Sequence, residues 1–240
     1  VKLDYADLSG AALSGVDLIY ADLIDANLTG ADVKNADLSN ADLNGADLSG
    51  ADLSGADLSG STVTENQFLS ALSVTGVTVQ NHEMSGWNLI DVDLRYADLS
   101  NANLTNANLT NAILYNVELD YAYLTNADLS NANLTNANLY RADLSGADLS
   151  GADLSGADLR YANLSNADLN GADLNAANLW SADMGGADLT NANLTNSILY
   201  SVKLDYADLS GAALSGVDLI YADLIDANLT GADVKNADLS

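Results

Sequence analysis

The sequence advances in steps of five residues, and this step restricts the fold more than any other feature. From Val1 to Gly60 it divides without remainder into units such as ADLSG, ANLTG and ADLNG. A period of five matches neither the 3.6-residue period of an α-helix nor the two-residue alternation of a long strand. The chain is therefore expected to form a solenoid, in which short straight segments and corners stack on their neighbours to make a common core.

Each unit has a small apolar residue first, usually Ala, and a large apolar residue third, usually Leu. Residues two apart in an extended segment point to the same side, so Ala and Leu are predicted to face the interior. The succession L-S-G-A is typical of a type II turn, in which Gly or Asn takes the positive φ at the third position. Every unit is thus predicted to give one short strand and one corner.

With these features the chain resembles the pentapeptide-repeat family, whose motif A(D/N)LXX is carried here by units such as ADLSG, ANLTN and ADLRY over nearly the whole length. The resemblance implies an all-β solenoid, a right-handed quadrilateral β-helix with four pentapeptides, hence 20 residues, in each coil. The central residue of the family motif corresponds to Leu8, Leu48, Leu99 and Leu149 in this chain.

The five-residue step breaks once, at the sequence STVTENQFLSA of residues 61–71. Thr64 and Gln67 are spaced as a capping box, so a short helix is predicted from Glu65 to about Ala71. The large apolar residues that follow have moved by one residue relative to those before the break. This organisation divides the chain into a solenoid over 1–60, a helical insertion over 61–71, and a solenoid over 72–240 that continues the first.

The helix is expected to turn Phe68, Leu69 and Leu72 toward the solenoid. The residues predicted to pack around the insertion are Phe68, Leu69, His82, Met84 and Trp87. The stretches QFLS and GWNL on either side of this region are similar to those of secreted bacterial members of the family. That similarity implies an extracellular or cell-surface location.

Residues 1–39 recur without change as residues 202–240, which gives a long period of 201 residues. We interpret the chain as a window of a longer tandem array. Ten coils of 20 residues plus one residue make this period, and the one residue matches the shift at the insertion. If the insertion replaces two pentapeptides plus one bulged residue, successive copies stack with equal faces in line. If it loops out entirely, copies are rotated by half a turn; the in-line arrangement is favoured.

The chain is strongly acidic, with 34 Asp and Glu against 7 Lys and Arg and a formal net charge of −27. Nucleic-acid binding is disfavoured because phosphate contacts need a basic surface. Cysteine is absent, which excludes disulfides and thiolate metal sites. No run of 18 apolar residues is present that could span a membrane.

His82 is the only histidine. It falls at the inward first position of HEMSG, and Trp87 holds the same position of the next unit. We therefore predict that His82 packs in a coil widened by the helix and takes no part in a Ser-His-Asp triad. A coil filled by Leu and Ala also leaves no pocket of ligand size. Neither enzymatic activity nor a cofactor is expected.

Asp148, Asp168 and Asp188 are spaced by 20 residues and are predicted to lie on one face, about 4.8 Å apart. Rows of carboxylates can hold Ca²⁺, which makes these three residues candidate calcium ligands. No compact ligand loop of the D-x-D-x-D-G kind accompanies them. The alternative is that the carboxylates bond to local backbone or water and attract divalent cations only diffusely.

Aromatic residues and arginines show the same spacing. Tyr140, Arg160, Trp180 and Tyr200 form one series, and Tyr121, Arg141 and Tyr161 form a second series beside it. Because interfaces are enriched in Tyr, Trp and Arg, this stripe predicts a lateral contact. Tolerated surface variation is the alternative, since an exposed arginine–aromatic contact is worth only about 1 kcal/mol.

Two functions are compatible with these features. The first is a non-enzymatic structural protein, a tandem β-solenoid of an extracellular fibre, sheath or surface layer that associates laterally or end to end with identical solenoids. The second follows from the resemblance, because some members of the family imitate acidic duplex DNA and bind topoisomerases. The long identical period favours the first, since extension by repetition serves a fibre better than a bounded binding module.

Overall fold

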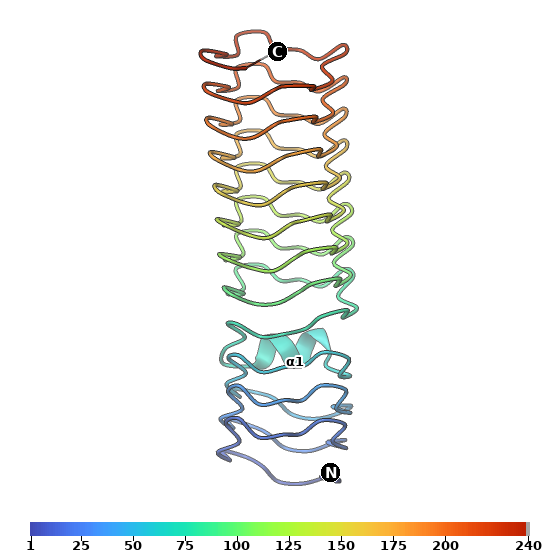
Figure 1. Cartoon of the computed structure of the whole chain (residues 1–240). Helices are drawn as coiled ribbons and strands as arrows, with labels where there is room; N and C mark the ends of the chain where they lie inside the picture. The colour runs from blue at the N-terminus through green and yellow to red at the C-terminus, as the bar shows by residue number, and fades with distance from the viewer. Residues whose placement is uncertain (239–240) are drawn as a thin grey trace.

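The computed structural model describes residues 1–238 and shows one elongated stack of coils. The N-terminus lies at one end of the stack and the last coils lie at the other (Figure 1). Parallel β-bridges join residues 20 positions apart, as between Asp128 and Asp148. Each regular coil therefore contains four pentapeptides. We number its four sides in chain order, so that residues 1–5, 6–10, 11–15 and 16–20 belong to sides 1, 2, 3 and 4. After the insertion, side 3 resumes at residue 72 and side 4 at residue 77, and the next complete coil begins with side 1 at residue 82.

Backbone hydrogen bonds between coils hold each side in register. Leu129 N donates to Asp148 O at 2.7 Å, and Asp148 N donates to Ala127 O at 2.9 Å. Within residues 1–238 the second residue of a pentapeptide forms an isolated bridge, and no extended strand is present. The predicted short strands are thus reduced to single-residue bridges, because a corner turns the chain after every five residues.

The corners are turns closed by a hydrogen bond from the first residue of one pentapeptide to the third residue of the previous one. Ala132 N donates to Leu129 O at 3.0 Å. The fifth residue has the positive φ that the predicted type II turn requires, 57° at Asn131 and 63° at Gly10. Gly and Asn are abundant at this position because they adopt this backbone conformation at the least cost.

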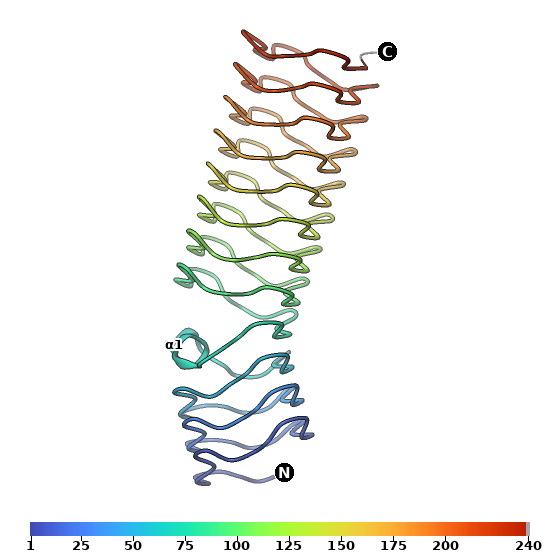
Figure 2. The same cartoon turned by 90° about the vertical axis from the view of Figure 1, so that its left-hand side faces the viewer.

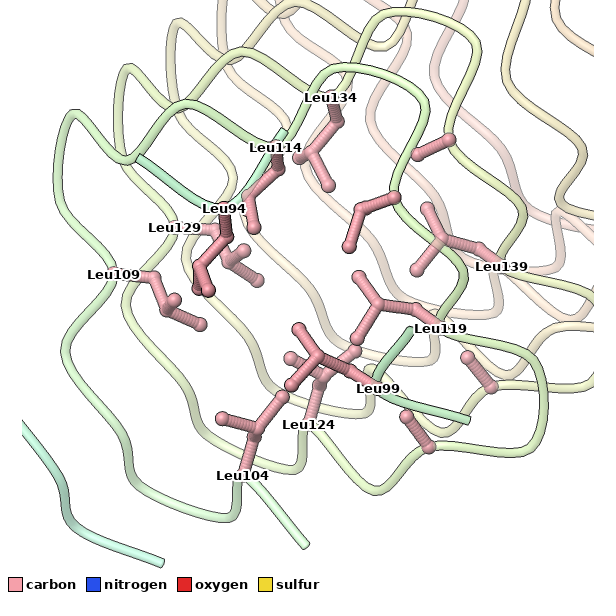
Figure 3. Close-up of a cluster of buried hydrophobic side chains, with 14 of the residues drawn as sticks. Leu94, Leu99, Leu104, Leu109, Leu114, Leu119, Leu124, Leu129, Leu134 and Leu139 are labelled. Atoms are coloured by element: carbon pink, nitrogen blue, oxygen red, sulfur yellow. The ribbon is translucent and has the colours of Figure 1, made fainter. Parts of the chain in front are cut away.

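Leucine and alanine side chains fill the interior in columns parallel to the axis. Leu94, Leu114 and Leu134 follow one another on side 3, and leucines of the other sides meet them around the same axis (Figure 3). These three leucines are at most 1% exposed. Burial of one leucine contributes about 2 kcal/mol before the entropy of chain ordering is subtracted. Stability therefore accumulates from contacts between neighbouring coils.

The insertion forms the helix α1, Glu65–Ser70, which lies at one edge of the stack (Figures 1 and 2). It begins with a capping box, in which Thr64 accepts a hydrogen bond from Gln67 N and Gln67 Oε1 accepts one from Thr64 N at 2.8 Å. Gln67 Nε2 also donates to Leu43 O at 2.6 Å and to Ala46 O at 2.9 Å. These last two bonds fasten α1 to the preceding coil, over the place of a side-2 pentapeptide.

One apolar side chain of α1 reaches the core. Phe68 is 1% exposed, whereas Leu69 is 43% and Leu72 is 73% exposed. The prediction that Leu69 and Leu72 face the solenoid is therefore wrong. Successive helical residues are about 100° apart, so two neighbouring side chains of so short a helix cannot both point inward. Leu72 follows the extended C-cap residue Ala71 and lies outside the helix.

The insertion adds a single residue to the register of the stack. Asp52 pairs with Ser73 and Asp57 pairs with Thr78, 21 positions apart. On side 4 the bridges form an unbroken ladder of ten steps, from Asp17 through Asp37, Asp57, Thr78, Asp98, Glu118, Asn138, Asp158, Asn178 and Ile198 to Asp218. Asp17 and Asp218 are the same residue of the 201-residue period. Equal residues of successive copies thus lie on the same side of the solenoid, without the half-turn of the alternative.

Candidate interaction surface

Aromatic and arginine side chains gather along the corner between side 4 and side 1. We call this row the aromatic corner, and it consists of Tyr121, Tyr140, Arg141, Arg160, Tyr161, Trp180, Tyr200 and Tyr221. Each residue is the fourth or fifth of a side-4 pentapeptide. Successive coils therefore place these side chains one strand spacing apart, about 4.8 Å. The two series of the predicted stripe lie along one edge of the solenoid.

The rings of the aromatic corner form a continuous chain of contacts. The ring centroids are 5.7 Å apart for Tyr121–Tyr140, 5.7 Å for Tyr140–Tyr161, 5.4 Å for Tyr161–Trp180, 6.5 Å for Trp180–Tyr200 and 5.3 Å for Tyr200–Tyr221. Four of these five contacts are edge-to-face, which is an arrangement that the charge distribution of aromatic rings favours. The rings therefore support one another along the axis.

Arg160 is held by a carboxylate of its own pentapeptide. Its Nε donates to Asp158 Oδ1 at 2.7 Å and its Nη2 donates to Asp158 Oδ2 at 2.5 Å. These hydrogen bonds raise the pKa of the Arg160 guanidinium above its ordinary value. The guanidinium carbon also lies 5.4 Å from the centroid of the Tyr140 ring. Its charge is thus matched within the molecule.

Arg141 is held by aromatic rings instead. Its guanidinium carbon lies 5.8 Å from the ring centroid of Tyr121, 5.3 Å from that of Tyr140 and 5.5 Å from that of Tyr161. Within residues 1–238, each of the other six Lys and Arg residues forms an ion pair with an Asp, and Arg141 forms none. The aromatic corner therefore presents one oriented cation whose charge is not matched by a carboxylate.

The aromatic corner is partly exposed and contains a shallow hollow. Tyr121, Tyr161 and Trp180 remain about two-fifths exposed. A hollow of 290 Å³ opens beside Trp180 and Tyr200, and Asn178, Ile198 and Asp218 of side 4 complete its lining. Large half-exposed aromatic side chains beside an apolar hollow are typical of a protein–protein contact surface.

Two residues of this surface are absent from the predicted stripe. Tyr221 continues the series of Tyr121 and Tyr161 after two serines, so the same count of 20, carried further, would have found it. Ile198 is 43% exposed at the second position of its pentapeptide, where Asp or Asn is usual. An apolar residue at a position where the motif has Asp or Asn was the sequence feature that could have identified Ile198 as part of this surface.

Side 2 carries an uninterrupted row of five aspartates. We call it the acidic row, and it consists of Asp128, Asp148, Asp168, Asp188 and Asp208. In each residue Oδ1 accepts the N–H of the residue two positions later, at 2.9 to 3.0 Å. Within the described chain no Lys or Arg pairs with any of the five.

The calcium candidates Asp148, Asp168 and Asp188 belong to this row and lie one bridge apart, as their spacing requires. Ca²⁺ needs six to eight oxygens around one point. The part of the chain that the structure describes contains no group of three or more His, Cys, Asp or Glu that could hold a metal ion. The geometry thus offers no support for a calcium site here, and diffuse association of divalent cations stays a prediction.

The residues around the insertion form a compact cluster. His82 is buried, and its Nε2 lies 3.1 Å from Val63 O, so this nitrogen carries a hydrogen and donates it. The ring of Trp87 lies 5.6 Å from the His82 ring and 5.8 Å from the Phe68 ring. Met84 is fully buried. His82 thus packs in this coil against Trp87. Among the described residues no helix is long and apolar enough to cross a membrane.

Comparison with known proteins gives the family of the chain. The family described as "pentapeptide repeats" matches the chain in 8 copies, over residues 1–35, 21–60, 88–120, 118–156, 137–175, 172–211 and 207–240. The chain belongs to the pentapeptide-repeat family. No curated protein sequence matches it significantly.

Two solved structures are similar to this pentapeptide-repeat chain. HetL, a pentapeptide repeat protein involved in heterocyst differentiation regulation from the cyanobacterium Nostoc sp. strain PCC 7120, is 32% identical, with a TM-score of 0.50 over 95% of this chain and 90% of HetL. A trypsin-treated variant of QnrB1, a plasmid-mediated fluoroquinolone resistance protein, is 21% identical, with a TM-score of 0.64 over 77% of this chain and 91% of QnrB1. The likeness to QnrB1 is one of fold alone.

The buried histidine gives this pentapeptide-repeat solenoid a pH dependence of its own. Burial lowers the pKa of His82, and this effect outweighs the Val63 carbonyl and the Glu83 charge, which raise it. The unfolded chain therefore binds a proton before the folded chain does, and stability falls as the pH drops below about 6.5. We expect the melting temperature of the wild type to fall between about pH 7.5 and about pH 5.5.

The His82→Ala variant is the matched control, because alanine is the usual residue at this position of a pentapeptide. Its melting temperature should stay level across the same interval, whatever its absolute value. All carboxylates are common to the wild type and the variant, so the difference between their slopes reports residue 82. Equal slopes for the wild type and the variant, followed by circular dichroism, would contradict the assignment.

Proposed function

We propose that this chain is part of a non-enzymatic structural protein, a tandem solenoid of an extracellular or cell-surface fibre, sheath or layer. We take the solenoid to be right-handed, as the family resemblance implies. Its backbone bears load along the axis through the ladders of hydrogen bonds, and its aromatic corner contacts identical solenoids at the side. End-to-end association of solenoids is the second form of assembly that we expect.

The observation that carries this proposal is the unbroken ladder from Asp17 to Asp218. Since equal residues of successive periods lie on the same side, every copy in a tandem array presents its aromatic corner in the same direction. Ten coils give an axial distance of about 48 Å between equal points. A long body with identical contact patches in line at a constant interval is what lateral assembly into a fibre or layer requires.

Removal of rings from the aromatic corner is expected to weaken self-association of the chain. We expect Tyr161→Asn combined with Trp180→Ser to raise the dissociation constant at least about thirtyfold, the effect of losing central aromatic contacts. Asn is frequent at the fifth position of the motif and Ser is frequent at the fourth, so the coils should fold unchanged. Sedimentation velocity over a concentration series measures the dissociation constant.

Tyr123→Asn is the matched control, because Tyr123 is 56% exposed on side 1 and makes no ring contact within the described residues. It should associate as the wild type does. A wild-type chain that stays monomeric at its highest soluble concentration, with no filaments or sheets by electron microscopy, would remove the proposed function.

The proposed location outside the cell or on its surface has a separate test. Antibodies raised against the chain should label intact cells of the organism that makes it. Labelling that requires permeabilised cells would contradict the location, and leave the solenoid and its association untouched.

A second candidate is an acidic module that imitates DNA toward a topoisomerase-type partner. The net charge of −27 spread over roughly twelve coils gives about one charge per 2 Å of axis, near the 1.7 Å of duplex DNA. The fold shared with QnrB1 is compatible with this role. A DNA gyrase supercoiling assay tests it: inhibition at micromolar chain supports the module, and unaffected supercoiling removes it.

A further inference from the structure

Arg141 is prepared to bind an anion. Three tyrosine rings surround its guanidinium, and its side chain donates no hydrogen bond within the described residues. A planar guanidinium fixed in this way loses little conformational entropy when it binds a carboxylate. Among the described Lys and Arg residues all the others are already paired with an aspartate, so Arg141 is the one whose charge is left for a partner.

The same chain supplies a matching anionic surface. In each of Asp148, Asp168 and Asp188 the local N–H occupies Oδ1, and Oδ2 accepts no hydrogen bond within residues 1–238. Asp128 binds its local N–H in the same way, and its carboxylate also interacts with the Thr110 side chain. Asp208 likewise uses Oδ1 alone, for Ser210 N and Asn228 Nδ2. The acidic row therefore presents five carboxylate oxygens, free of ion pairs, in one line along the axis.

We propose that the aromatic corner of one solenoid docks on the acidic row of a second copy of this chain, with Arg141 paired to one of its aspartates. The inference rests on the lateral association proposed above and names the surface that receives the corner. Charge complementarity selects this occupant, because Arg141 meets carboxylates while the tyrosine hydroxyls around it can donate to the neighbouring oxygens of the row.

The spacing of the two surfaces agrees. Both repeat once per coil, so parallel solenoids keep corner and row in register over several coils. The aromatic corner lies between sides 4 and 1 and the acidic row lies on side 2, so a solenoid that uses its corner on one neighbour keeps its acidic row free for another. Such a contact is heterologous, so each solenoid can join two neighbours. Repeated contacts of this kind would extend the assembly laterally, as a layer or sheath requires.

Two variants test the proposal by sedimentation. The first is Arg141→Asn, and the second combines Asp148→Asn, Asp168→Asn and Asp188→Asn. Asparagine already occupies both kinds of position in other coils and keeps the Oδ1 that accepts the local N–H, so both variants should fold. We expect each to raise the dissociation constant at least about tenfold.

The acidic-row variant is the more discriminating, because it removes three negative charges. General repulsion between acidic chains would then fall and association would rise. A weaker association therefore reports a specific contact. The matched controls are Arg95→Ser, which removes a paired arginine, and the combination Asp143→Asn, Asp153→Asn and Asp173→Asn on sides 1 and 3. Both controls should associate at least as well as the wild type.

Mixing the two deficient variants gives the decisive result. One retains an intact row and the other an intact corner, so an equal mixture should form lateral dimers with nearly the wild-type dissociation constant and should not extend laterally beyond the dimer. If the acidic-row variant associates as its control does, or if the mixture stays monomeric, the docking is overturned while lateral association through the corner stands. If the wild type itself is monomeric, both the docking and the proposed function fall.

Discussion

Replacing Leu134 by alanine is expected to lower the free energy of unfolding by about 3 kcal/mol. Leu134 is fully buried on side 3, in the column that begins with Leu94 and Leu114 (Figure 3). The backbone around it cannot close the resulting cavity. Leu134 N is bonded to Asp153 O at 2.7 Å in the next coil, and Asn133 N to Ala112 O at 2.9 Å in the previous one. The cost of the cavity is therefore added to the loss of apolar burial.

The chain itself provides the matched control for this change. Met84 and Met184 occupy the same third position of their pentapeptides and are fully buried. Leu134→Met should therefore cost less than about 1.5 kcal/mol. Guanidinium unfolding followed by circular dichroism compares the two variants, and hydrogen exchange should show the first loss of protection in the coils next to residue 134. An alanine variant as stable as the methionine variant would show that the coils relax around a missing side chain.

The sequence was sufficient for the coil because the same unit recurs. Leu and Ala at fixed places, together with Gly or Asn at the corner, predict the interior columns and the positive φ found at Asn131 and Gly10. One residue of surplus in the long period predicts the single-residue shift found between Asp52 and Ser73. Because every pentapeptide shows the same pattern, an unusual residue at one position does not change the fold predicted from the others.

The insertion was harder to predict because it occurs once. The capping box gave the start of α1, but no repeat shows which face of a short helix is buried. Phe68 and Leu69 are both apolar and adjacent in sequence, and packing against Trp87 selected Phe68. The fate of Leu72 depended on the extended C-cap at Ala71, which no residue pattern in this segment indicates.

The sequence could have predicted that Arg160 forms an ion pair with an aspartate of its own pentapeptide and that Arg141 does not. Arg160 occurs in D-L-R, two residues after Asp158, and Arg95 stands in the same relation to Asp93. Arg141 follows N-L-Y and occupies the fifth position with a φ of 57°, so no aspartate stands two residues before it. Its contacts with Tyr140 of its own pentapeptide and with Tyr121 and Tyr161 of the adjacent coils required the structure, because ring orientations are not fixed by spacing.

Replacing Phe68 by alanine is expected to have an effect of similar or larger size, a loss of about 3 to 5 kcal/mol of stability. Phe68 is 1% exposed and is the side chain with which α1 enters the coil in place of a regular pentapeptide. The neighbouring leucines cannot replace it, since Leu69 of α1 is 43% exposed and Leu72, beyond the helix, is 73% exposed. Leu69→Ala is accordingly the control, with an expected cost below about 1 kcal/mol.

The local effect of this variant can be separated from global unfolding. Trp87 packs at 5.8 Å from Phe68, and Trp180→Ser leaves Trp87 as the one tryptophan of the chain. In that background Phe68→Ala should shift the emission of Trp87 to longer wavelength, because water reaches the ring from the vacated side. The Leu69→Ala variant should leave the emission unchanged. If both variants lose stability equally and neither shifts the emission, α1 does not contribute to the core of the solenoid. The predicted difference would instead show that Phe68 continues the core through the insertion. Phe68 would then also maintain the in-line stacking of successive periods.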